Sequence, residues 1–264
     1  MKKVLVLLML PALARAATPT APVSASEKRA ARAITESALR GHVRFLASDL
    51  LGGRAPASPG DRLAQEYIQS QMESTGLEPG APDGSWFQKV SLVGILGKVP
   101  DKISVSKAGQ SVDLTKMDDY VAFSGTQKPE SRLDKAEIVF VGYGIVAPEY
   151  QWDDYKDVDV KGKVLLMMNN DPEDDPKLFA GKTRLWYGRW DYKYVMAARK
   201  GAAGAFIIHT EPSAGYKWQV VQSSWSRERF ELPYEGEPRV EIKGWFTEDA
   251  SKKIAALGGK DLDQ

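Results

Sequence analysis

The stretch GRWDYKYVMAARKGAAGAFIIHT, residues 188–210, is typical of a helix that leads into a buried strand. We expect the helix to begin near Asp191, whose carboxylate can cap the first turn. Gly201 ends it, because glycine is common just after a helix. The unbroken apolar run at 204–209 predicts a strand covered on both faces, as in parallel sheets. The helix is expected to turn three side chains inward: Tyr192, Val195 and Met196.

Around this unit the chain favours short strands separated by turns. Further strands are predicted where Val, Ile, Leu and aromatic residues gather: 85–95, 103–105, 136–146, 161–170 and 238–246. A last helix is expected from Thr247 to about Leu257. Thr247 can cap this helix, and two acids follow in its first turn, where the helix dipole favours them.

The N-terminal third is predicted to be helical. Apolar residues recur at helical spacing from Ile34 to Leu50, and the sequence LGGR at 51–54 ends that pattern. A second helix is expected at 58–75, because Ser58 can cap it and Pro59 suits the first helical position. Gly76 then closes it.

The chain of 264 residues has a formal net charge of +1 and no cysteine. This composition does not indicate a polyanionic partner such as nucleic acid, and it excludes disulfides and cysteine-ligated zinc. Residues 1–16 combine Lys2 and Lys3 with a short apolar run and an Ala14-Arg15-Ala16 cleavage pattern, which is typical of a bacterial secretory signal. Residues 17–34 follow as a flexible linker.

Motifs that carry chemistry are incomplete. The segment PKLFAGKT, 176–183, resembles the end of a phosphate-binding loop, but Pro176 replaces its first glycine. The acidic loop 170–175 is a candidate calcium site, although its spacing matches no standard calcium loop. Alternatively, Pro172 and the following Pro176 make it a stiff, solvated turn.

The two histidines, His42 and His209, are the natural candidates for zinc or a catalytic triad. Neither is flanked by a nucleophile motif or by a His-Glu-x-x-His helix. His42 is expected inside a helix as a boundary residue. His209 is expected to mark the end of a strand and not to bind zinc.

The segment HVRFLASDLLGGRAPASPGDRLAQEYIQSQMESTGLEP, 42–79, together with WFQKV at 86–90, resembles the N-terminal segment of the secreted zinc aminopeptidases of the leucine aminopeptidase and glutamate-carboxypeptidase clan. The matching features are Leu46-Ala47-Ser48-Asp49, Gly53-Arg54, Pro59-Gly60, Tyr67, Gly76-Leu77, Trp86 and Gln88.

Three further segments resemble the protease-associated (PA) domain inserted in many of these peptidases. They are VFVGYGI at 139–145, DYKDVDVKGKVLLMMNNDP at 154–172 and YGRWDYKYVMAARKGAAGAFIIH at 187–209. The resemblance spans about residues 38–258. It implies an α+β chain with helices of an incomplete α/β peptidase domain followed by a β-rich PA domain. The expected parts are a signal peptide at 1–16, the linker at 17–34, a peptidase segment at 35–100, the PA domain at 101–258 and a tail at 259–264.

In that family, two zinc ions are held by histidines and carboxylates beyond the PA insert, and the first ligands form a His-x-Asp motif. This chain contains no His-x-Asp, so no catalytic residue and no metal ligand carries over. The resemblance implies an exported piece, periplasmic or extracellular, of an aminopeptidase that is inactive alone. Its partners would be peptide substrates or a chain that supplies the missing half.

If the PA insert covers the family's cleft, Tyr187, Arg189 and Trp190 are its expected lip residues; the alternative is that they pack at the start of the helix near Asp191. The expected helices would leave apolar side chains uncovered: Leu46, Leu50, Tyr67, Ile68 and Met72. The alternative function is a stand-alone exported PA-type module that binds peptides or proteins without catalysis.

Overall fold

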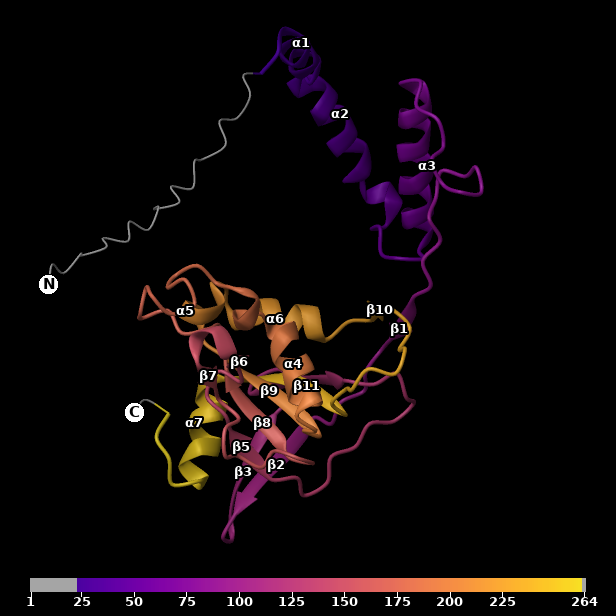
Figure 1. Ribbon diagram of the computed structural model, residues 1–264. Coiled ribbons are helices and arrows are strands. Elements are labelled where there is room, and N and C mark those ends of the chain that lie inside the picture. The colour runs from indigo at the N-terminus through magenta and orange to yellow at the C-terminus, as the bar shows by residue number, and fades with distance from the viewer. Residues whose placement is uncertain (1–22, 263–264) are drawn as a thin grey trace, which may run out of the picture. The chain divides into compact units, whose positions relative to one another are not determined.

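A computed structural model describes residues 23–262 of the chain, which divide into two compact units between Gln88 and Lys89 (Figure 1). The signal peptide expected at 1–16 lies outside the described residues. The described chain contains helices together with sheets of parallel and antiparallel strands, as an α+β chain should.

The first unit is helical. It contains α1 (Ala25–Ala33), α2 (Glu36–Leu46), the short 3-10 helix η1 (Asp49–Leu51) and α3 (Pro59–Ser74). Part of the stretch expected to be a linker is therefore α1. Its sequence explains why, because Ser24 and Glu27 form a reciprocal capping box. The helix expected from Ile34 to Leu50 is interrupted after Leu46, and Ser48 caps η1 separately.

The helix predicted at 58–75 is confirmed as α3. The Ser58 hydroxyl accepts a hydrogen bond from the backbone N–H of Asp61, and Pro59 occupies the first turn. Gly60 lies where this helix meets the preceding loop. A Cβ on Gly60 would lie 1.8 Å from the carbonyl oxygen of Gly53 and 2.3 Å from that of Leu51. Only glycine permits this approach of two backbone segments.

The second unit is built on a five-stranded sheet of order β4-β11-β9-β8-β5. The strands β5 (Ile138–Phe140), β8 (Val164–Met168), β9 (Gly204–His209) and β11 (Ile242–Thr247) are parallel, and β4 (Tyr120–Ser124) is antiparallel to β11. All six residues of β9 are buried, which confirms the strand predicted at 204–209.

Helices cover both faces of this sheet (Figure 1). The helices α4 (Trp190–Arg199) and α6 (Trp218–Trp225) pack on one face, where Leu165, Ile207 and Trp245 project. On the opposite face, α7 (Glu248–Leu257) and the hairpin of β2 (Lys102–Lys107) and β3 (Gln110–Thr115) cover Leu166, Phe206 and Phe246. The second unit therefore has a core on each side of its sheet.

Short ribbons complete the second unit. The strand predicted at 85–95 is only β1 (Val93–Ile95), paired with β10 (Arg229–Glu231), because no neighbouring strand reaches the residues before it. The long strand predicted at 136–146 is broken after β5. Gly142 and Gly144 adopt positive φ there, and the chain resumes as β6 (Val146–Ala147), which pairs with β7 (Trp152–Asp153). Three short helices lie in the loops of the described part of this unit: η2 (Pro148–Tyr150), η3 (Trp186–Gly188) and α5 (Glu211–Ala214).

The start and the inward face of α4 differ from the prediction. Arg189 is the residue before the first turn and makes no side-chain cap, whereas Asp191 lies inside the turn. Val195 is exposed. The buried side chains are Tyr192, Lys193, Tyr194, Ala197 and Ala198. The small alanines let α4 lie close to the sheet and so decide which face turns inward. By contrast, α7 begins after Thr247 as predicted, and the Thr247 hydroxyl accepts from the Ala250 N–H.

Candidate functional site

Several polar groups lie close together at the carboxyl ends of β5 and β8, and they form the candidate functional site of the second unit. Ligand crevices in parallel sheets form where the strand order reverses. Here β5, β8, β9 and β11 follow one another across the sheet in chain order, so no such reversal separates them. Any chemistry at this edge must therefore come from the loops after the strands and from α4.

Lys193 of α4 lies at the centre of this edge and has no exposed surface. Its ammonium group donates to the carbonyl oxygen of Tyr143 at 2.6 Å and to that of Asn170 at 2.7 Å. The first carbonyl belongs to the loop after β5 and the second to the loop after β8. One buried side chain therefore joins α4 to the ends of two parallel strands.

Burial has the largest effect on the pKa of Lys193. Removal from water lowers the pKa of Lys193 to about 7. The negative charges of Asp154 and Asp171 raise the pKa, but their effect is smaller than that of burial. Asp154 accepts from the backbone N–H of Ile145 and Asp171 from that of Leu185. These carboxylates thus hold loops in place as well as facing the lysine.

A polar hollow of about 410 Å³ lies beside the loop after β8. Its lining residues are Asn170, Asp171, Glu173, Gly181, Lys182, Arg184, Pro212 and Gly215. Of the four acids in the acidic loop 170–175, Asp171 is buried, whereas Glu173, Asp174 and Asp175 are exposed. The loop therefore does not gather its carboxylates around one point, and calcium binding there stays an untested expectation.

His209 is the last residue of β9 and is 4% exposed. It lies among the rings of Tyr216, Trp218 and Trp245, and burial lowers its pKa. The other histidine, His42, faces the Tyr67 hydroxyl at 2.9 Å. Within residues 23–262 no three histidine, aspartate or glutamate side chains lie close enough to hold a metal ion. The described residues therefore do not fit a zinc site.

The three expected lip residues lie together before and at the start of α4, but their surroundings differ. The Tyr187 hydroxyl donates to Glu149, which raises the pKa of Tyr187 to about 12. Arg189 is exposed. Trp190 is half-buried, and its ring lies 6.0 Å from that of Tyr194.

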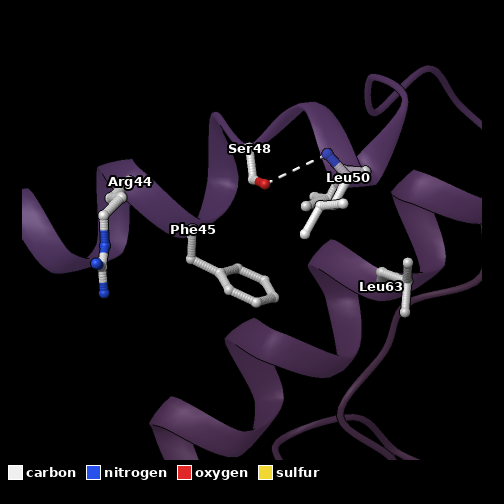
Figure 2. Close-up of a pocket in the computed structure, with 6 residues that line it drawn as sticks. Arg44, Phe45, Ser48, Leu50 and Leu63 are labelled. Carbon is white, nitrogen blue, oxygen red and sulfur yellow. Dashed lines mark hydrogen bonds between the residues drawn. The ribbon is translucent and has the colours of Figure 1, made fainter.

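The first unit contains an apolar groove of about 480 Å³ between α2, η1 and α3 (Figure 2). Figure 2 shows Phe45, Leu50 and Leu63 around this hollow, with the Leu50 N–H donating to the Ser48 hydroxyl. Leu50 is 93% exposed. Its neighbours Phe45 and Leu63 are exposed as well, and Arg44 lies at the rim. The groove is therefore an uncovered apolar surface.

No protein-family model matches the sequence, and no curated protein matches it. Two of the solved structures that it resembles are bacterial aminopeptidases. The aminopeptidase from Aneurinibacillus sp. strain AM-1 aligns with 85% of this chain at 17% identity and a TM-score of 0.36. The zinc aminopeptidase BSAP from Bacillus subtilis aligns with 84% at 16% identity and a TM-score of 0.32. The alignments cover 42% and 40% of those proteins, so the chain spans less than half of their length. Similarity at this level does not establish a shared fold or activity.

Sequence reasoning missed Lys193, because the apolar spacing assigned the inward face of α4 to Val195. The signal that identifies the true face is the pair Ala197 and Ala198, which are small enough to pack against a sheet. Lys193 lies four residues before Ala197 and therefore on that face.

Proposed function

We propose that this chain is the N-terminal and PA-domain portion of an exported zinc-dependent aminopeptidase and does not hydrolyse peptides by itself. The support from sequence is the set of family motifs between about residues 38 and 258. The complete enzyme would remove N-terminal residues from peptides, with two zinc ions activating water. No step of that reaction is assigned to a residue of this chain.

The observation that carries this proposal is the uncovered apolar surface of the first unit. Among its residues from 23 onward, only Leu51, Gly60 and Ala64 are buried. Three of the side chains expected to be uncovered, Leu50, Ile68 and Met72, are exposed, while Leu46 and Tyr67 are half-buried. Exposed apolar patches of this kind mark interfaces or aggregation. We propose that the rest of a peptidase domain covers this surface.

The lip residues belong to the same proposal. Tyr187 and Trp190 lie close to the start of α4, beside the exposed Arg189 and Trp186. In a complete enzyme this corner of the PA domain would face the peptide. The hydrogen bond from Tyr187 to Glu149 would then fix the edge of the lip.

A second candidate is a stand-alone exported PA-type module that binds peptides or a partner protein. The observation in its favour is the second unit itself, which buries a core on each face of its sheet. Domains with their own core can fold independently. Under this proposal the first unit is an appendage that recruits a partner through its groove.

Size-exclusion chromatography combined with a thermal melt separates the two proposals. An incomplete peptidase domain predicts that the purified chain self-associates, whereas a fragment of residues 89–264 elutes as a monomer and melts cooperatively. A full chain that is itself monomeric, with one cooperative transition that includes the helices of the first unit, would favour the stand-alone module.

We further propose that the chain is exported to the periplasm or beyond, on the strength of its N-terminal sequence. Between residues 23 and 262, no helix combines the length and apolar character needed to cross a bilayer. Cleavage after Ala16 or Ala17, read by N-terminal sequencing of secreted protein, tests the export proposal.

A further inference from the structure

Arg229, the first residue of β10, inserts its guanidinium group among three aromatic rings. Its central carbon lies 4.5 Å from the ring centre of Trp225, 5.4 Å from that of Phe123 and 5.9 Å from that of Trp190. These rings come from α6, β4 and α4. Three elements of the second unit thus build one box around a single cation.

The walls of the box are fixed by their own packing. Phe123 and Trp225 are buried and meet edge to face at 88°. Tyr194 lies behind them, tilted 63° from Trp225 and 60° from Trp190. The Tyr194 hydroxyl donates to the carbonyl oxygen of Gly244 at 2.8 Å, which anchors it to the sheet. The rings are therefore held in place by contacts that do not involve Arg229.

Within the described residues, no acidic side chain pairs with the positive charge of Arg229. No ion pair or side-chain hydrogen bond is made by Arg229 in that part of the chain, and its buried Nη1 has no acceptor. The nearby Glu231 instead pairs with Arg239 at 3.1 Å and Lys243 at 2.8 Å. Arg229 is half-buried, and charges removed from water normally need such partners. The ring faces are thus the main attraction for this guanidinium, which is also weakly hydrated.

We infer that Phe123, Trp190 and Trp225 form a recognition box for a guanidinium group, and that Arg229 is its built-in occupant. An arginine side chain from another molecule is the class of ligand that fits, and it can enter when Arg229 leaves. Because the walls are held by contacts that do not involve Arg229, replacing the Arg229 side chain leaves the box vacant for such a ligand.

The direct test is a titration of the full-length Arg229→Ala variant with methylguanidinium, followed by tryptophan fluorescence. We expect a saturable change with half-saturation on the order of 10 mM, because a few cation–π contacts supply only weak binding. The neutral, similarly shaped methylurea is the matched ligand control, and ionic strength is kept constant with sodium chloride. Adding Trp190→Leu to the variant should weaken the response several-fold.

The inference is overturned if the folded variant shows no saturable response, if methylurea acts as well as methylguanidinium, or if the wild type responds equally. Circular dichroism verifies that the variant is folded. If Arg229→Ala does not fold, Arg229→Lys and Arg229→Met decide the question. A cation box predicts that the lysine variant melts about 2–4 °C above the methionine variant. A methionine variant that melts at the same or a higher temperature contradicts it.

Discussion

Lys193 places a positive charge where the ends of β5 and β8 meet α4, and its two carbonyl acceptors are backbone atoms of separate loops. A buried lysine of this kind is normally costly unless it is paired. Asp154 and Asp171 offset part of that cost, yet burial dominates and lowers the pKa. The protonation state of Lys193 therefore affects how α4 is held to the loops after β5 and β8.

Between pH 7 and about 10, the unfolded chain keeps the Lys193 proton while the folded chain loses it. Because the folded state binds fewer protons, the free energy of unfolding rises with pH across this window. From pH 7 to pH 9 we expect roughly 2 kcal/mol from this residue. Urea denaturation of wild type and Lys193→Met at both pH values measures it, and an equal rise in both proteins would refute the assignment.

Gly60 tests the packing of the first unit. We expect Gly60→Ala to cost at least about 2 kcal/mol, because the added methyl group would strike two backbone carbonyls that cannot move aside. Gly41→Ala is the matched control, since a Cβ there meets nothing within 4 Å and alanine favours helix. Thermal melts followed by far-UV circular dichroism compare the two. Similar melts for both variants would show that the close approach is unimportant.

At the scale of elements, the β11–α7 junction depends on one side chain. Thr247 ends the strand, its hydroxyl caps the helix, and its backbone N–H donates to the Asp119 carbonyl. We expect Thr247→Ala to lower the free energy of unfolding by about 1 kcal/mol. Thr247→Ser, which keeps the hydroxyl, should retain most of the stability. Chemical denaturation of both variants measures this, and a serine variant as unstable as the alanine variant would exclude capping as the cause.

Local signals in the sequence were sufficient to locate the elements that carry their own start and stop residues. Ser58 and Pro59 located α3, Thr247 located α7, and the apolar run at 204–209 located β9. The prediction was wrong for most of 85–95, because a strand also needs a partner and β10 is far away in sequence. The inward face of α4 was wrong because its packing depends on the sheet beneath it. Residues such as Lys193 and Arg229 depend on such distant contacts, so local spacing alone did not reveal them.

At the scale of the whole molecule, the two units differ in how much apolar surface they bury. The second unit covers both faces of its sheet, whereas the first leaves the groove at Phe45, Leu50 and Leu63 open. Under the proposed function this contrast is expected, because the rest of a peptidase domain would bind at the groove.

We therefore expect Leu50→Ser combined with Leu63→Ser to reduce binding of a hydrophobic fluorescent dye by about half and to reduce self-association. The second unit should melt unchanged, because neither residue lies in it. Leu232→Ser, which replaces an exposed leucine of the second unit, is the matched control and should have little effect. Equal loss of dye binding in both variants would show that the groove binds the dye no better than another exposed leucine does.

An assay for aminopeptidase activity in the purified chain tests the proposal that this chain does not hydrolyse peptides by itself. Release of the amine product from amino-acid p-nitroanilides is measured with the full-length chain after incubation with excess zinc. We expect no turnover above buffer and no zinc retained after gel filtration, because the described residues do not fit a zinc site. Zinc-dependent turnover that a chelator abolishes, by the chain alone, would contradict it.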